Sequence, residues 1–262
     1  MRPNGVRRLI AEGKPVVNGW LAIANSFSAE TMAQCGFDAI TIDMQHGIVD
    51  YQASIAMLQA ISTTSATPMV RVPWNEPGIL MKVLDAGSYG IICPMINTKE
   101  EAEALVAACR YPPKGSRSFG PSRAVLYGGG DYAKHANDEI LVFAMVETRK
   151  GLDNLEAILS VEGIDGIYVG PSDLSLSFGA PPTLDPSDAD VLKAMQRICD
   201  VTRAKGRIAG VHTDGPKTAL RRYKEGYQLC TIMNDVRLMA NAATAAVREV
   251  RGEMPAPAAK TY

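Results

Sequence analysis

Short apolar runs recur along the whole chain, and longer amphipathic segments separate them. The runs are almost continuously apolar, which is typical of strands that are covered on both faces of a parallel sheet. Eight runs predict strands at Val16–Ile23, Ala39–Ile42, Pro68–Val72, Gly90–Ile92, Leu141–Val146, Gly166–Val169, Ile208–Val211 and Leu229–Met233. The segments between them predict helices, among them Tyr51–Ile61, Gly78–Ala86, Lys99–Cys109, Gly151–Leu159, Ala189–Lys205 and Pro216–Glu225.

The regular succession of strand and helix predicts an α/β protein whose sheet is parallel, with right-handed crossovers. Eight repeats predict a single (β/α)8 TIM barrel domain over residues 1–262, and an open doubly wound sheet is the alternative. The length of 262 residues fits one such barrel. We expect residues 254–262 to form a loose tail after a long Ala-rich helix.

One connection interrupts this rhythm. The segment Tyr111–Asp138 is long, rich in Gly and Pro, and contains Gly128, Gly129 and Gly130 in succession. Connections of this length inside a compact domain are usually active-site covers or disordered segments. We therefore expect one of these two roles for it.

Composition excludes several classes of protein. The formal net charge is -1, so no electrostatic argument favours binding to nucleic acid or to a membrane surface. The 5 cysteines are odd in number and form no C-x-x-C motif, which favours reduced thiols. No apolar stretch is long enough to cross a bilayer, and the N-terminus has no signal-peptide pattern. A cytoplasmic location is expected.

Polar residues follow several of the predicted strands at the point where each strand ends. Asp43 to His46 follow the second strand, Arg71 lies at the end of the third, Glu147 follows the fifth, and Gly170 to Asp173 follow the sixth. Catalytic residues of (β/α)8 barrels lie at this end of the strands. Charges at a buried strand end are costly unless they are paired or bind a metal.

Glu147 and Asp173 end adjacent strands, so their carboxylates can converge. Two carboxylates with room for water suit Mg²⁺, Mn²⁺ or a similar divalent ion. In the alternative interpretation, one of the two acids caps a helix and the other pairs with Arg71, and Asp173 is then a helix N-cap or an acid in the first helical turn. Spacing alone leaves both interpretations open.

The pair Asp43 and His46 predicts an acid/base group, because an aspartate can orient a histidine and stabilise its protonated form. The alternative is an ordinary surface histidine. The other two histidines have weaker contexts: His135 lies in the long connection, and His212 follows a strand with no acid before it.

Arg71 carries a fixed charge and a forked set of donors that match a carboxylate or a developing oxyanion. It can also serve as an internal ion-pair partner of Asp43 or Glu147. The segment Gly170, Pro171 and Ser172 is either a cradle for a substrate carboxylate or an ordinary tight turn.

Lysines are absent from all eight apolar runs. An aldolase that forms a Schiff base needs a lysine inside the barrel, so the sequence disfavours imine chemistry. The sequence also has no P-loop and no G-x-G-x-x-G motif after its first strand.

An ordered set of motifs resembles the HpcH/HpaI aldolase family. These are class II pyruvate aldolases in the phosphoenolpyruvate/pyruvate superfamily of barrels. The motifs span most of the chain: Phe37-Asp38-Ala39-Ile40 leading to Asp43-Met44-Gln45-His46-Gly47, then Val70-Arg71-Val72-Pro73-Trp74-Asn75, Val146-Glu147-Thr148, and Val169-Gly170-Pro171-Ser172-Asp173-Leu174-Ser175.

The resemblance implies a role for each candidate residue. Glu147 and Asp173 would bind the divalent metal, with Mg²⁺, Mn²⁺ and Co²⁺ as candidates. Arg71 would stabilise the 2-oxo oxygen of the substrate and the enolate formed from it. His46, oriented by Asp43, would be the acid/base.

The resemblance also implies that Ser172, with Gly170 and Pro171, receives the substrate carboxylate. Asp85 matches an acid that assists the catalytic histidine across a subunit contact. Family members are usually hexamers, trimers of dimers that exchange their last helix, so we expect the helix Asp235–Arg251 to pack on a partner.

Two residues depart from the pattern of relatives. Gln45 stands where many relatives have a Glu before the catalytic histidine, and Met145 stands where some have a Gln two residues before the metal-binding Glu. The first change removes a negative charge near the base, and the second removes a polar partner for a metal-bound water. Neither touches the metal-binding acids, so the expected reaction type is unchanged.

The expected function is therefore a metal-dependent aldolase that cleaves or forms 4-hydroxy-2-oxo acids. Its substrates would be pyruvate, or a related 2-oxo acid, and an aldehyde. A citramalyl- or malyl-CoA-type lyase of the same superfamily is one alternative, although no clear basic patch for CoA is present. A non-catalytic barrel that binds small acids is the other.

Overall fold

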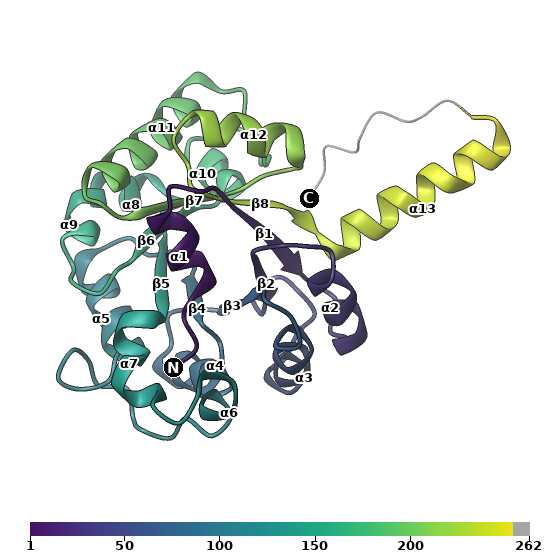
Figure 1. Cartoon of the computed structure of the whole chain (residues 1–262). Helices are drawn as coiled ribbons and strands as arrows, with labels where there is room; N and C mark the ends of the chain where they lie inside the picture. Colours follow the sequence, from purple (N-terminus) through teal and green to yellow (C-terminus); the bar gives the residue numbers. More distant parts are fainter. Residues whose placement is uncertain (254–262) are drawn as a thin grey trace.

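Eight parallel strands form a closed barrel in the computed structural model, which describes residues 1–253 (Figure 1). Each strand pairs with its neighbours in chain order, and the last pairs with the first. The strands are β1 (Val16–Leu21), β2 (Ala39–Asp43), β3 (Thr67–Arg71), β4 (Gly90–Cys93), β5 (Leu141–Met145), β6 (Gly166–Val169), β7 (Ile208–His212) and β8 (Leu229–Asn234). The predicted TIM barrel is confirmed, and each predicted strand end lies within two residues of the observed one.

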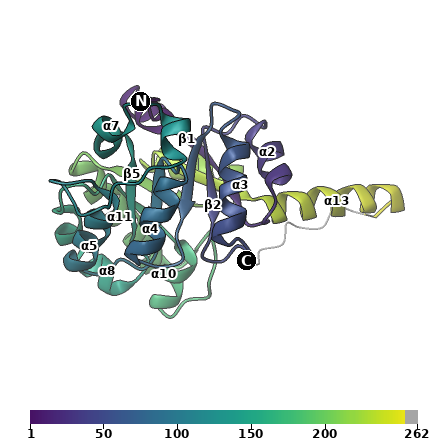
Figure 2. The ribbon, with the colours of Figure 1, turned by 90° about the horizontal axis from the view of Figure 1, so that it is seen from below.

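Helices surround the barrel in the described residues (Figures 1 and 2). They are α1 (Gly5–Ala11), α2 (Ser26–Ala33), α3 (Tyr51–Ile61), α4 (Pro77–Asp85), α5 (Lys99–Cys109), α6 (Ala124–Gly128), α7 (Tyr132–Glu139), α8 (Arg149–Asp153), α9 (Leu155–Leu159), α10 (Pro171–Ser177), α11 (Ala189–Ala204), α12 (Pro216–Lys224) and α13 (Asp235–Arg251). Local capping explains sharp boundaries such as that of α5, where Thr98 and Glu101 form a reciprocal capping box.

One predicted helix is divided. The segment expected to form a helix at Gly151–Leu159 contains two short helices, α8 and α9, which meet at Asn154. The backbone of Asn154 leaves the helical region, and its side-chain amide donates to the carbonyl of Asn97 at 2.8 Å. This bond to another loop explains the break, because asparagine side chains compete with helical hydrogen bonding.

Side chains alternate between the barrel interior and the layer of helices, as the period of a strand requires. The interior holds large side chains such as Trp20, Met69, Phe143 and Tyr168, which form one buried cluster. A second, larger cluster fills the space between the strands and the helices. The packed interior therefore leaves no path through the barrel, and a ligand must reach the carboxyl ends of the strands from the solvent on that side.

The long connection lies at the opposite end of the barrel from the predicted site residues. It joins a helix to the following strand, so it runs at the amino-terminal ends of the strands, and Figure 2 shows α7 beside the N-terminus at that end. It holds α6 and α7, and its buried Arg117 donates to Asp85 at 2.6 Å and to the hydroxyl of Tyr132 at 3.2 Å. The segment therefore does not cover the site of its own chain, and it is not disordered, because it holds two helices and buried side chains.

Helix α13 extends away from the barrel (Figures 1 and 2). Its first residue, Asp235, accepts hydrogen bonds from the backbone N–H groups of Ala22 and Ile23, and it is the buried residue of the helix. Met239 and Val250 are 61% and 90% exposed. The predicted tail at residues 254–262 lies outside the described residues, and no helix within residues 1–253 is long and apolar enough to span a membrane.

Candidate active site

Asp43 and Arg71 form a buried ion pair at the carboxyl ends of β2 and β3. Nε of Arg71 donates to Oδ1 of Asp43 at 2.9 Å, and Nη2 donates to Oδ2 at 2.6 Å. Trp20 donates its indole N–H to Oδ2 of Asp43 at 3.1 Å, and its ring lies 4.8 Å from the Arg71 guanidinium. Burial would raise the pKa of Asp43, but the bonds from Arg71 outweigh it and lower the pKa below its ordinary value.

His46 lies on the loop after β2, with an exposed side chain. Asp43 Oδ1 accepts the backbone N–H groups of Gln45 and His46 at 3.0 and 3.2 Å. Within residues 1–253, the Asp43 carboxylate makes no hydrogen bond to the imidazole of His46. Asp43 therefore holds this histidine through the loop backbone, and not through the ring as the sequence suggested.

Glu147 is only 3% exposed, although it carries a carboxylate. Its Oε1 accepts the backbone N–H of Met95 at 2.9 Å. Burial raises the pKa of Glu147 most strongly, the hydrogen bond from Met95 and the charge of Arg71 lower it, and the charge of Asp173 raises it, so that the pKa lies at about 7. The two acids thus lie close enough for their charges to interact, as their positions at the ends of adjacent strands predicted.

Asp173 lies in the first turn of α10 and is half-buried. The residue before the helix is Gly170, and no side chain caps the helix there, so Asp173 is not its N-cap. Its position agrees instead with the other form of the alternative interpretation, in which Asp173 is an acid in the first turn of the helix. Arg71 forms an ion pair with Asp43, one of the two partners considered for it.

Glu147 and Asp173 fit a divalent cation. Burial disfavours the charge of Glu147, and a bound cation would offset that cost. Carboxylate oxygens are the ligands that Mg²⁺ and Mn²⁺ prefer. Among residues 1–253 no group of three or more histidine, cysteine or acidic side chains could hold a metal, so water and substrate oxygens would complete the coordination.

The turn at Gly170, Pro171 and Ser172 lies directly against Glu147. A Cβ atom on Gly170 would stand 2.2 Å from Oε2 of Glu147, so only glycine allows this approach. Pro171 has no N–H, and its carbonyl accepts the hydroxyl of Ser175 at 2.7 Å. The Ser172 hydroxyl is buried and has no hydrogen-bond partner in the described part of the chain, which suits a ligand oxygen.

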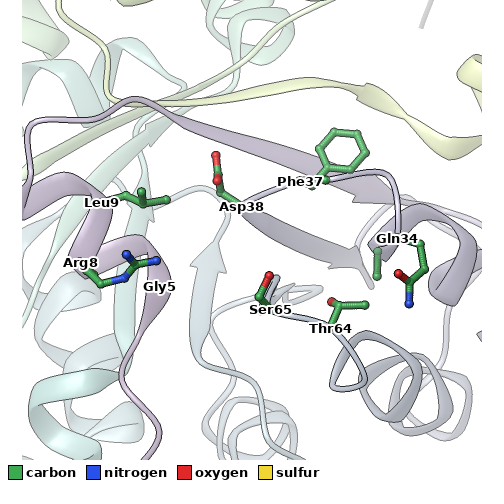
Figure 3. Close-up of a pocket in the computed structure, with 10 residues that line it drawn as sticks. Gly5, Arg8, Leu9, Gln34, Phe37, Asp38, Thr64 and Ser65 are labelled. Atoms are coloured by element: carbon green, nitrogen blue, oxygen red, sulfur yellow. The ribbon is translucent and has the colours of Figure 1, made fainter.

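A cavity of about 110 Å³ opens at this end of the barrel. Asp43, His46 and Arg71 line it together with Trp20 and His212, whereas Glu147, Ser172 and Asp173 are not part of its lining; the lining also includes Ala22, Leu184, Met233, Asn234 and Arg237. A larger hollow, of about 350 Å³, lies at the other end and is lined by residues such as Arg8, Gln34 and Asp38 (Figure 3). None of the predicted site residues lines that hollow.

Asp85 is not brought to this site within the chain. It ends α4 at the opposite end of the barrel and pairs with Arg117 at 2.6 Å, and its side chain is 26% exposed. A contact between Asp85 and His46 would require a second copy of the chain. The role of Asp85 stays a prediction.

His212 is a site residue that the sequence pattern does not single out. Its ring lies edge-on to Trp20 with centroids 4.8 Å apart, and its Nδ1 lies 3.3 Å from the hydroxyl of Tyr168. Burial lowers the pKa of His212 to about 3, and the charge of Arg71 lowers it too. Alternation along β7 places His212 on the same face as Ile208, which lies in the barrel interior, but the apolar run alone does not show which face points inward.

Comparisons with known proteins agree with this geometry. The profile of the HpcH/HpaI aldolase/citrate lyase family matches residues 18–242. A hydroxypyruvate/pyruvate aldolase from Rhizorhabdus wittichii is 40% identical over 95% of this chain and 99% of its own length. A 5-keto-4-deoxy-D-glucarate aldolase from Escherichia coli is 36% identical over 92% of this chain and 94% of its own.

A solved structure is also similar. The HpcH/HpaI aldolase/citrate lyase family protein from Burkholderia cenocepacia superimposes with a TM-score of 0.87 and is 32% identical, covering 95% of this chain and 99% of that one. The family profile and the relatives cover nearly the whole barrel and all the strand-end residues described above. The chain therefore belongs to the HpcH/HpaI aldolase/citrate lyase family and is a carbon–carbon lyase.

Proposed function

We propose that this enzyme is a divalent-metal-dependent aldolase that cleaves and forms 4-hydroxy-2-oxo acids. Its donor would be pyruvate or a closely related 2-oxo acid, and its acceptor an aldehyde. The observation that carries the proposal is the pair Glu147 and Asp173, two neighbouring acids at the open rim of the barrel, one of them deeply buried with a raised pKa. The relatives named as pyruvate and keto-deoxy-glucarate aldolases support the same substrate class.

Glu147 and Asp173 would hold the cation beside the turn at Ser172. When bound, a divalent ion supplies Lewis-acid stabilisation of negative charge, a contribution of several kcal/mol in many enzymes. The buried, unpartnered hydroxyl of Ser172 would donate to the substrate carboxylate. This would fix the donor at one end and direct its 2-oxo group toward Arg71.

Arg71 would stabilise the oxyanion that develops on the 2-oxo oxygen. Its guanidinium is held by two hydrogen bonds to Asp43 and lies against the ring of Trp20, so it is oriented before the substrate binds. A donor that need not reorganise during the reaction stabilises the transition state more effectively than water does. Asp43 and Trp20 would therefore be positioning residues for Arg71.

His46 would move the proton in the cleavage direction. It lines the same cavity as Arg71, on a loop whose backbone Asp43 holds in place. His46 would take the proton of the 4-hydroxyl group, the bond between C3 and C4 would break, and the electron pair would pass to the 2-oxo oxygen as the enolate. Protonation of C3 would then release the 2-oxo acid, and aldol addition would follow the reverse path.

Imine chemistry is not part of the proposal. None of the eight strands described here carries a lysine, so the barrel interior offers no amine to the 2-oxo carbon. Borohydride added together with pyruvate is therefore expected to leave the enzyme active and its mass unchanged.

An oligomer that shares helix α13 also belongs to the proposal. The helix leaves the barrel after Asp235 and presents large apolar side chains, among them Met239, Val247 and Val250, to solvent. Monomeric proteins rarely expose such a row of apolar residues on an extended helix. A second copy that covers them, in a dimer or in a hexamer built from dimers, would remove this exposure.

The direct test is a coupled comparison of three activities. Purified enzyme with Mg²⁺ is incubated with pyruvate and a panel of small aldehydes, and the condensation product is measured by chromatography. Cleavage of malyl-CoA and citramalyl-CoA is measured in parallel. Condensation without thioester cleavage supports the aldolase, thioester cleavage alone contradicts it, and inactivity in both assays would favour a binding protein.

A further inference from the structure

His212 is a partly buried histidine at the rim of the site, and the proposed reaction has no use for it. It ends β7, lines the cavity with His46 and Arg71, and contacts Trp20 edge-on at 4.8 Å. Its Nδ1 is occupied by the hydroxyl of Tyr168. Within the described residues, its other nitrogen, Nε2, has no hydrogen-bond partner. What that nitrogen can do depends on which of the two carries the proton.

A chain of buried hydrogen bonds below the site fixes this proton. It begins at Asn18, inside the barrel, whose amide contacts the hydroxyls of Thr41 and Thr231. Both polar atoms of the Asn18 amide have suitable hydrogen-bond partners in the orientation in which its nitrogen donates to the carbonyl of Ala39 at 3.1 Å. Its oxygen then accepts the hydroxyls of Thr41 at 3.0 Å and Thr231 at 2.8 Å. Asn18 is therefore an acceptor toward Thr231.

The direction of the remaining bonds follows, because each hydroxyl has a single proton. Thr231 gives its proton to Asn18, so its oxygen accepts the hydroxyl of Tyr168, at 2.6 Å. The Tyr168 proton is thereby committed, and its oxygen must accept from Nδ1 of His212, at 3.3 Å. The neutral ring consequently has its proton on Nδ1 and an uncovered lone pair on Nε2.

We propose that Nε2 of His212 accepts a hydrogen bond from a substrate hydroxyl group, so that this enzyme selects a hydroxylated aldehyde or a hydroxylated 2-oxo acid. The inference rests on the proposed aldolase function and names a specificity-determining residue for it. His212 shares a cavity of about 110 Å³ with His46 and Arg71, so a substrate hydroxyl that hydrogen-bonds to it must lie close to the reacting carbons.

The surroundings of His212 keep it an acceptor. A protonated imidazole would donate from both nitrogens and could not receive a hydroxyl proton. Burial disfavours that charged form most strongly, and the positive charges of Arg71 and Arg237 disfavour it as well, whereas Asp43 favours it. The ring is therefore neutral over the physiological range of pH, and its tautomer alone decides its role.

Kinetic selectivity tests the proposal. Wild type and His212→Phe are compared for glycolaldehyde against acetaldehyde with pyruvate, and for hydroxypyruvate against pyruvate with acetaldehyde. The variant is expected to lose roughly 3- to 10-fold in kcat/KM for the hydroxylated member of one pair only, which is the worth of one neutral hydrogen bond. The affected pair identifies whether the hydroxyl belongs to the acceptor or to the donor.

Tyr168→Phe and Tyr227→Phe provide a matched pair of variants. Each removes the hydroxyl of a buried tyrosine, but Tyr227 bonds to the carbonyl of Met195, away from His212. Tyr168→Phe is expected to lower the preference for the hydroxylated substrate, because the proton on Nδ1 of His212 loses its acceptor and the tautomer is no longer fixed. Tyr227→Phe is expected to leave the preference unchanged. Equal losses for hydroxylated and plain substrates in His212→Phe would overturn the proposal.

Nitrogen NMR of histidine-labelled wild type tests the tautomer without any substitution. The expected spectrum has a protonated Nδ1 and a bare Nε2 for His212, assigned by its loss in His212→Phe or, if that variant does not fold, in His212→Gln. A proton on Nε2 would overturn the proposal. A wild type that turns over none of the substrate pairs would contradict the aldolase function instead, and the NMR result would still decide the state of His212.

Discussion

Asp43 and Arg71 stand directly opposite each other on neighbouring strands, and the guanidinium gives two hydrogen bonds, at 2.9 and 2.6 Å, to the same carboxylate. Each residue is nearly inaccessible to solvent. The pair therefore has two roles, because it fixes the orientation of the arginine and also satisfies two buried charges. Substitution of either residue changes both catalysis and stability, and experiments on this site must measure the two separately.

Arg71→Ala is expected to lower kcat by about 10²–10³, the usual loss for one oxyanion donor. It should also destabilise the fold by about 3–5 kcal/mol, because it leaves the Asp43 charge buried and unpaired. Arg71→Lys should restore part of the stability but little of the activity, since a single ammonium lacks the forked donor set. Steady-state kinetics and urea unfolding on the same samples check both expectations. Full activity in a folded Arg71→Ala enzyme would make the residue purely structural.

His46→Ala is expected to lower kcat by about 10²–10⁴, the range for loss of a general acid/base. The side chain is exposed, so the variant should unfold at the same urea concentration as wild type. His135→Ala serves as the matched control, because it removes another exposed histidine, on α7 at the far end of the barrel. Wild-type turnover by a folded His46→Ala enzyme would exclude the assignment.

His212 predicts a specific pH dependence of stability. Its pKa falls from an ordinary value of 6.5 to about 3 in the folded chain, so between these values the unfolded chain binds the extra proton. Stability from this group is therefore lost as the pH decreases from 6.5 toward 3, by at most about 1.4 kcal/mol per pH unit. His212→Phe should remove this part of the slope.

Glu147 has the opposite effect on the pH dependence of stability over part of the same pH range. Its pKa rises from 4.5 to about 7, so its contribution favours the folded chain at low pH and is lost as the pH rises through 7. The test is therefore the difference between wild type and His212→Phe, measured by urea unfolding with a chelator present. A difference that does not vary between pH 5 and 6.5 would contradict the neutral state of His212.

The sequence predicted the barrel well because the signal is redundant. Eight apolar runs separated by helical segments admit few topologies, and strands such as Gly166–Val169 end at the predicted residues. The polar residues at or just after the ends of strands, including Arg71 and Glu147, were also predictable, because the fold places the carboxyl end of every strand at one rim.

Residues that act through three-dimensional contacts were harder to predict. Trp20 and Tyr168 lie within continuous apolar runs, where the sequence does not distinguish inward from outward positions. His212 was set aside because no acid precedes it, yet its partner is Tyr168 from the neighbouring strand. The long connection was misjudged because its length indicated importance but not the end of the barrel at which it lies.

Oligomer formation is expected from the exposed face of α13. Sedimentation of the purified enzyme should give a species larger than one chain, and Met239→Glu combined with Val250→Glu should shift it toward the monomer, because charges cannot be buried in an apolar contact without cost. Lys193→Glu, at an exposed position of α11, is a suitable control for the added charge. A wild-type enzyme that is monomeric and fully active would contradict the shared helix.

The central claim is that Glu147, Asp173 and Arg71 together support formation of an enolate from a 2-oxo acid with a divalent cation. Exchange of the methyl protons of pyruvate with D₂O, followed by proton NMR, measures this step directly and does not depend on the identity of the aldehyde. Enzyme with Mg²⁺ is expected to catalyse the exchange, chelated enzyme to lose it, and re-added Mg²⁺ to restore it, while Glu147→Gln and Asp173→Asn stay inactive but folded. Exchange that continues at the full rate in chelated enzyme, or in either variant, would contradict the account.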